Sequence, residues 1–166
     1  ESLVAELATE LVARIGELTI RIQQLERRIA ELMAELSPRL LELAGCAALT
    51  AAKIVGETAD VRRFRSRAAF AMNNGTAPIP VWSGNHQRFR LNRGGNRQLN
   101  AAMHRIAITQ LRLNGAGRIY LDAKVAAGAT KKEALRALRR RVSDEVYRRL
   151  REDRLERSVG TPRLAA

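Results

Sequence analysis

One serine and a group of basic residues stand together in the middle of the chain. Ser83 is followed by Gly84, and no carboxylate interrupts the basic residues after it, which are His86, Arg88, Arg90, Arg93 and Arg97. A hydroxyl beside unpaired guanidinium groups suits phosphate chemistry, because the arginine fork matches phosphate oxygens and a positive field stabilises charge in a transition state. Gly84 would let another backbone come close to the serine. This segment therefore predicts a serine nucleophile that attacks a phosphodiester.

Other kinds of chemistry have weaker support in the residues. His86 and His104 lie far apart in the sequence, and no acidic cluster has metal-ligand spacing, so we expect no metal or other cofactor in this segment. A Ser-His-Asp triad lacks a carboxylate to orient His86. The pair Gly94-Gly95 lacks the Lys-Ser/Thr of a nucleotide-binding loop. The other internal serines are predicted to be helix caps or helix surface, which leaves Ser83 as the candidate.

The composition favours a polyanion as partner. The 166 residues include 30 Lys and Arg against 17 Asp and Glu, which gives a net charge of +13 and a pI of about 11.4. Neutralising phosphates releases counterions and gives affinity without sequence preference. The single cysteine, Cys46, excludes an internal disulfide and fits a reducing cytoplasm. The apolar runs are too short to cross a bilayer, so we expect no membrane partner.

The first 37 residues predict a long oligomerisation helix. Apolar residues repeat in heptads, with a positions at Ala8, Ile15, Ile22, Ile29 and Leu36 and d positions at Val4, Leu11, Leu18, Leu25 and Leu32. Ile at a with Leu at d favours a parallel two-stranded coiled coil. A single amphipathic helix packed on its own domain and pairing with an upstream helix are the alternatives. The chain begins without Met and already in helical register, so we expect further protein upstream.

Residues 38–150 predict a small helical domain. Ser37-Pro38 can cap a short helix over 39–44, a turn at Gly45 follows, and a second helix over 49–57 carries Lys53. Two short helices joined in this way resemble a helix-hairpin-helix, which holds a DNA phosphate through backbone N–H groups. A purely structural helical hairpin is the alternative.

Further helices are predicted over 66–72, 97–113 and 118–127, and a long one follows a capping box at Thr130 and Glu133. Its apolar stripe consists of Ala134, Leu138, Val142, Val146 and Leu150. Its arginines predict either a phosphate-binding face or a solvated one. Residues 151–166 are expected to form a frayed tail. The predicted fold is all-α, with one irregular catalytic loop at its centre.

Several separated motifs resemble the C-terminal transposase domain of the bridge-RNA-guided insertion-sequence transposases. The resemblance covers roughly residues 39–150 and rests on Leu43-Ala44-Gly45-Cys46 through Glu57, Phe64-Arg65-Ser66, Gly75-Thr76-Ala77-Pro78, Ser83-Gly84 and Asn92-Arg93-Gly94-Gly95-Asn96-Arg97-Gln98-Leu99. In that family a RuvC-like domain with four acidic metal ligands and a coiled coil come first. Two positions depart from the family pattern: Ala47, where a second glycine is usual, and Trp82, where a small residue is common. Trp82 could stack on a base or pack against the protein.

The resemblance implies a function in DNA transposition. It implies that Ser83 attacks the scissile DNA phosphate and forms a covalent serine–DNA link. It also implies DNA and a guide RNA as partners, self-association through the coiled coil as a dimer or a dimer of dimers, and Mg²⁺ held by the upstream RuvC-like domain. We expect the 166 residues alone to be inactive in recombination. The alternative is a non-catalytic, basic nucleic-acid-binding scaffold that dimerises through its coiled coil.

Overall fold

The computed structural model describes residues 2–90 and 92–160, and these are mainly helical. The described elements, in chain order, are α1 (Leu3–Leu36), α2 (Pro38–Leu41), α3 (Ala48–Thr58), the 3₁₀ helix η1 (Val61–Arg63), α4 (Arg67–Asn73), β1 (Ile79–Ser83), β2 (His86–Arg90), α5 (Arg97–Arg112), α6 (Ala116–Ala126) and α7 (Lys131–Gly160). The all-α prediction is therefore confirmed, with a single small β-hairpin. None of the described helices is both long enough and apolar enough to cross a membrane.

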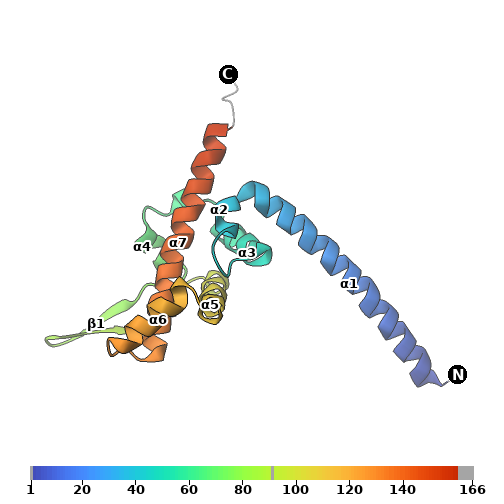
Figure 1. The fold of residues 1–166 in the computed structure, drawn as a ribbon, viewed down its shortest axis with the longest axis horizontal. Coiled ribbons are helices and arrows are strands. Elements are labelled where there is room, and N and C mark those ends of the chain that lie inside the picture. Colours follow the sequence, from blue (N-terminus) through green and yellow to red (C-terminus); the bar gives the residue numbers. More distant parts are fainter. Residues whose placement is uncertain (1, 91, 161–166) are drawn as a thin grey trace.

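Helix α1 and the hairpin extend from opposite sides of a body formed by the other helices (Figure 1). The predicted heptad residues of α1 lie mostly in solvent: Ile15 is 63% exposed and Ile22 is 54% exposed. Only the C-terminal end of α1 joins the body, where Met33 is buried and Ile29 and Leu36 pack against the core. The helix was predicted correctly, and its apolar stripe has no partner within this chain's described residues.

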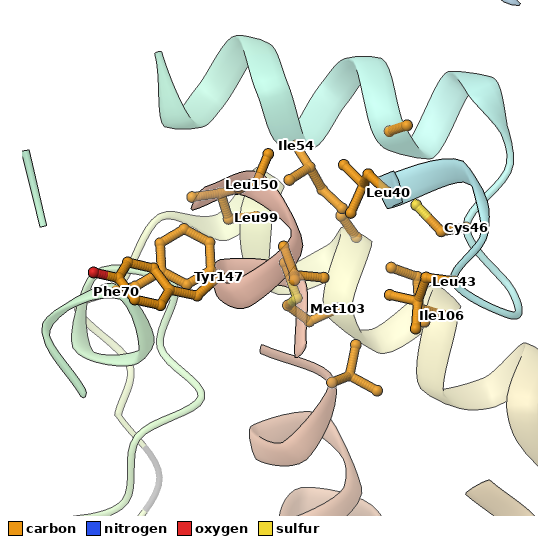
Figure 2. Packing of buried hydrophobic residues seen from close by; sticks show 14 of the residues in the cluster. Leu40, Leu43, Cys46, Ile54, Phe70, Leu99, Met103, Ile106, Tyr147 and Leu150 are labelled. Atoms are coloured by element: carbon orange, nitrogen blue, oxygen red, sulfur yellow. The ribbon is translucent and has the colours of Figure 1, made fainter. Parts of the chain in front are cut away.

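The core lies between α2, α3, α5 and α7. Figure 2 shows Ile54 of α3 and Leu40 of α2 facing Leu99 and Met103 of α5, and Leu150 of α7 joins them. Leu99, Met103 and Ile54 are fully buried, as the helical spacing of apolar residues requires for a face that packs on a core. The predicted stripe of α7 is buried throughout. The packing of these faces fixes the positions of α5 and α7, the helices that lie beside the hairpin.

Local capping signals mostly act as the sequence predicts. Ser66 Oγ accepts a hydrogen bond from Ala69 N at 3.2 Å. Thr130 N–H donates to Glu133 Oε2 at 2.9 Å, and Glu133 N–H donates back to Thr130 Oγ1 at 3.3 Å, which is a complete capping box.

Ser37 and Pro38 occupy the predicted N-cap and N1 positions of α2, but the expected side-chain cap is not made. Instead, Asp153 of α7 accepts a hydrogen bond from Arg39 N at 3.1 Å. This carboxylate is buried, and burial raises its pKa above the ordinary value while its hydrogen bonds to Ser37 and to backbone N–H groups oppose that shift. Helix α2 is therefore capped across the fold by α7.

Two other expectations need correction. The segment expected to be an irregular loop contains the hairpin β1-β2, since Pro78 and Pro80 permit extended chain and Gly84 permits a tight turn. The tail was expected to fray from residue 151, but α7 continues to Gly160. Buried Asp153 explains part of this continuation, because it ties the end of α7 to α2. Residues 161–166 lie outside the described residues.

Candidate nucleic-acid interface

Ser83 lies at the tip of the β-hairpin. The strands pair antiparallel, with Ile79 opposite Arg90 and Ser83 opposite His86, so only Gly84 and Asn85 form the turn. Gly84 has φ of 58° at the first turn position, as a type II′ hairpin turn requires. Ser83 is exposed, and a Cβ added to Gly84 would meet no atom within 4 Å. The tip therefore leaves room for a large molecule to reach the serine hydroxyl.

The base of the hairpin, in contrast, is held firmly by backbone and amide groups. Asn96 N–H donates to Asn73 O at 2.6 Å, and Asn92 Nδ2 donates to Met72 O at 3.1 Å. These bonds join the segment that leaves the hairpin to the segment that enters it. The two segments touch so closely that a Cβ on Gly95 would overlap the Gly75 backbone. The hairpin is therefore an arm with a fixed base and a free tip.

A second set of bonds ties this base to α5 and α7. Asn74 is fully buried and donates through Nδ2 to Ser143 Oγ at 2.7 Å. The Asn74 carbonyl accepts from Asn100 Nδ2 at 2.8 Å. The asparagines in Asn73-Asn74-Gly75 are, from the sequence, residues typical of a turn. Their side-chain role was missed, because the partners lie in distant parts of the sequence.

One face of the hairpin carries exposed aromatic rings. Trp82 is 67% exposed and Phe89 is 61% exposed. Side chains alternate along a strand, and Phe89 pairs with Pro80, so Trp82 and Phe89 lie on the same face. Ser83 follows Trp82 directly in β1, so its side chain lies on the opposite face of the hairpin. The question of whether Trp82 packs within this chain is thus answered: its ring is open to solvent, as a ring that stacks on a base must be.

The structure gathers only part of the predicted basic set. Arg93 and Arg97 are exposed and line a recess beside the hairpin base, together with His104 and Arg139. Asn92 and Asn100 complete its wall, and no carboxylate is found among the described residues that line it. We call these six residues the arginine recess. Arg90 lies in a neighbouring hollow, which shares Asn92 and Arg139 with the recess and also contains Phe89, Tyr120 and Glu133. For His86 and Arg88 the structure describes the backbone in β2 only.

On sequence grounds His104 was considered only as a metal ligand, but in the structure this residue lines two hollows. It belongs to the arginine recess and also to a neighbouring hollow with Gly45, Arg105 and Arg112. Burial lowers the pKa of the His104 imidazole, and the Arg139 charge lowers it further. An anion bound nearby would reverse the second effect.

Gly45 and Lys53, the two residues predicted from the helix-hairpin-helix resemblance, have clear structural tasks. Gly45 has φ of 87°, and a Cβ there would lie 3.0 Å from Ile106 O. Lys53 Nζ donates to Gln98 Oε1 at 2.8 Å and so joins α3 to α5. Ala47 takes an extended conformation with φ of −83°, so the alanine is unstrained where the family usually has glycine. These positions hold the helical hairpin against α5.

The arginines of α7 divide into two kinds. Arg140 pairs with Asp144, Arg148 pairs with Glu145 and Glu152, and Arg149 pairs with Glu145 and Glu42. Their charges are largely balanced within the fold, which argues against a uniform phosphate-binding face. No ion pair is recorded for Arg139 among the described residues, nor for Arg136, Arg141, Arg151 and Arg154. Arg139 differs from these four in that its Nε is buried without a hydrogen-bond partner. The sequence placed it on the same arginine face and gave no signal that separates it from its neighbours.

The described residues also contain no group of three or more His, Cys, Asp or Glu side chains that could hold a metal ion. Cys46 is buried, and burial raises the pKa of its thiol to about 12, so its environment is that of a structural residue. The candidate site therefore consists of a serine at a hairpin tip, exposed rings along the hairpin and a basic recess at its base.

Comparison with known proteins supplies a family. A model of the family described as "Transposase IS116/IS110/IS902 family" matches residues 37–122, which is more than half of the chain. The chain is also 36% identical over 110 residues to a Streptomyces coelicolor protein described as the uncharacterized 43.6 kDa protein of insertion element IS110. That alignment covers 65% of this chain and only 27% of the relative. The chain thus spans about a quarter of the relative's length.

Proposed function

Because the chain belongs to the IS116/IS110/IS902 family of transposases, we propose that it is the part of a DNA transposase that supplies the serine nucleophile and grips the DNA beside it. The observation that carries the proposal is the position of Ser83 at the exposed tip of a hairpin with a fixed base. Because the base of the hairpin is fixed, the Ser83 hydroxyl can occupy only a restricted region of space relative to the scissile phosphate. Because the tip is exposed, a DNA duplex can approach it.

The proposed chemistry is a transesterification. Ser83 Oγ attacks the scissile phosphorus, an O–P bond forms, and the bond from phosphorus to the adjoining nucleoside oxygen breaks. The hydroxyl proton passes to a base, and the departing oxygen accepts a proton. The phosphoester bond energy stays in the serine–DNA link, so the strands can be rejoined without an external energy source.

The basic surface of the same chain would hold the nucleic acid. Arg90, Arg93 and Arg97 project from the hairpin and the start of α5, where they can contact phosphates of DNA or of a guide RNA. Trp82 and Phe89 can stack on bases that leave the helix. His86 and Arg88 belong to the same proposal through their places in β2.

Other parts of the protein would complete the assembly. The unpartnered heptad stripe of α1 would pair with a second copy, as a dimer or within a dimer of dimers, in the bacterial cytoplasm. Mg²⁺ belongs to this proposal only through an upstream RuvC-like domain, since the described residues do not form a metal site. The 166 residues alone would then bind nucleic acid without recombining it.

A covalent-capture experiment tests the nucleophile. The longer parent protein is incubated with guide RNA, Mg²⁺ and end-labelled target DNA, and the products are separated on a denaturing gel. The parent should give a covalent protein–DNA band, and Ser83→Ala should give none while still binding DNA. Ser2→Ala is the matched control, because Ser2 is exposed and makes no side-chain capping bond.

The outcomes separate this function from a scaffold. An unchanged band in Ser83→Ala would place the nucleophile elsewhere. Intact DNA binding with no covalent band from the parent would favour the non-catalytic scaffold that dimerises through α1.

A further inference from the structure

Arg139 stands out among the described arginines of α7 because it is half-buried, has no recorded ion pair and leaves a guanidinium nitrogen buried without a hydrogen-bond partner. Its guanidinium contacts Asn100 Oδ1, and its Nε is buried with no hydrogen-bond partner. Burial lowers the pKa of this guanidinium, and the nearby Arg136 charge lowers it further. Arg140, the next residue, is also half-buried but pairs with Asp144. Arg139 is thus a cation that the fold removes from water without neutralising it.

Such a residue costs the folded protein stability. Removing a charge from water is unfavourable unless a counter-charge and hydrogen bonds replace the water. Asn100 offers one amide oxygen and no charge. A destabilising residue of this kind is usually retained for a function. An anion that binds beside Arg139 would supply the missing counter-charge and remove the destabilisation.

The surroundings of Arg139 have the composition of an anion site. The arginine recess adds Arg93, Arg97 and His104 around the same space, and none of its described lining residues carries a negative charge. The amide groups of Asn92 and Asn100 complete the wall. Asn92 Oδ1 accepts from Gly94 N at 3.0 Å and Asn92 Nδ2 donates to Met72 O, so the loop that carries Arg93 is fixed in place.

We infer that the arginine recess binds one backbone phosphate of the DNA strand that lies along the hairpin, with Arg139 as the donor at its floor. The planar fork of arginine can give two N–H···O bonds to one phosphate. Arg93 and Arg97 close over the phosphate from the rim, where they are exposed. The inference rests on the proposed function, because it takes the DNA partner from there.

The recess and Ser83 would contact different phosphates of the strand, because they lie at opposite ends of the hairpin. The recess adjoins the residues that flank the hairpin, whereas Ser83 lies at the far end of β1. Five strand residues span roughly 13 Å, and successive phosphates of one strand lie about 3.4 Å apart along the helix axis. A phosphate in the recess is therefore several nucleotides away from the one that Ser83 would attack. The recess would set the register of the strand relative to the nucleophile.

DNA binding as a function of salt tests this site. Fluorescence anisotropy of a labelled duplex is measured with the full chain at several KCl concentrations for wild type, Arg139→Gln, Arg139→Lys and Arg140→Gln. Arg139→Gln should bind about tenfold more weakly and should lower the slope of log K against log[KCl] by about 0.9. Arg139→Lys should keep the slope but lose part of the affinity, since it keeps charge without the fork. Arg140→Gln, whose charge is balanced by Asp144, should change little.

Thermal unfolding separates a binding role from a structural one. Without DNA, Arg139→Gln should unfold at the same temperature as wild type or a higher one, because it removes an unpaired buried charge. Added sulfate should raise the Tm of wild type more than that of Arg139→Gln. A lower Tm for Arg139→Gln with unchanged DNA affinity would make Arg139 a structural residue and overturn the inference.

Three further outcomes are decisive. A loss of affinity confined to guide RNA would overturn the assignment to DNA. If Arg139→Gln fails to fold, Arg139→Lys decides, and unchanged DNA affinity in that variant overturns the site. Ser83→Ala should bind DNA normally, so failure of this site leaves the covalent-capture result intact. A wild-type chain that binds no DNA would overturn this site, and the covalent-capture experiment with the parent protein would still decide the nucleophile separately.

Discussion

Asn74 donates a 2.7 Å hydrogen bond to Ser143 Oγ, and both side chains are fully buried although 69 residues separate them. Asn74 Oδ1 also accepts from Thr76 N at 3.1 Å and from Thr76 Oγ1 at 2.7 Å. One amide group therefore holds the entrance of the hairpin against α7. The position of the hairpin, and with it of Ser83, depends on this contact.

Replacing Asn74 should destabilise the fold. Asn74→Ala leaves Ser143 and Thr76 without their partner, and unmet buried polar groups cost about 2–3 kcal/mol in the free energy of unfolding. Urea denaturation measures this change. Asn85→Ala, in the exposed hairpin turn, is the control and should stay within about 0.5 kcal/mol of wild type. Equal effects of the two substitutions would show that the Asn74 contact carries no special stability.

The ion pairs of Glu145 should make stability depend on pH in the acid range. Arg148, and with it Arg149, lowers the pKa of Glu145 from 4.5 to about 2. A lowered pKa means that the stabilisation is complete above pH 4.5 and is lost as the pH falls toward 2. Because the side chain is 32% exposed, solvent screening reduces the contribution to about 1–2 kcal/mol.

Glu145→Gln tests this dependence. It should lower stability at neutral pH and flatten the fall in stability between pH 4.5 and pH 2, as measured by denaturant unfolding across that range. Glu31→Gln, on the exposed part of α1, should leave the profile unchanged. A Glu145→Gln profile parallel to that of wild type would assign the acid sensitivity to other carboxylates.

Two glycines should respond to alanine in opposite directions. Gly45 has φ of 87° and lies against Ile106 and Thr109, so Gly45→Ala should cost about 1–2 kcal/mol or more. Gly16 is inside α1 with open space around it, so Gly16→Ala should stabilise the helix by about 0.5–1 kcal/mol. Helix content and thermal unfolding measure both. A neutral Gly45→Ala would mean that the turn can adopt another conformation.

The seam of α1 should control self-association. Ile22 is an a position of the heptads and is 54% exposed, whereas Ile20 is 59% exposed and lies outside the seam. Ile22→Asp should therefore weaken a coiled-coil dimer at least tenfold, and Ile20→Asp should not, because only the first puts a charge between paired helices. Sedimentation equilibrium measures the association constants. A wild-type chain that remains monomeric at all concentrations would contradict the coiled-coil proposal.

The sequence by itself determined the features that depend on near neighbours. The heptads of α1, the Thr130-Glu133 box and the Ser66 cap involve residues within one or two helical turns, so their spacing is visible in the chain. The serine in a basic, proline-led segment was visible for the same reason. The fold class followed from these periodic segments.

Only the tertiary structure decided the pairing between distant residues. It turned the expected irregular loop into a hairpin with Ser83 at its tip, and it made Asp153 rather than the Ser37 side chain the acceptor for Arg39 N–H at the start of α2. It also separated Arg139, with an uncompensated charge, from Arg140, which reaches Asp144. These outcomes depend on which groups become buried together when α5, α7 and the hairpin base pack, and local sequence spacing does not encode that.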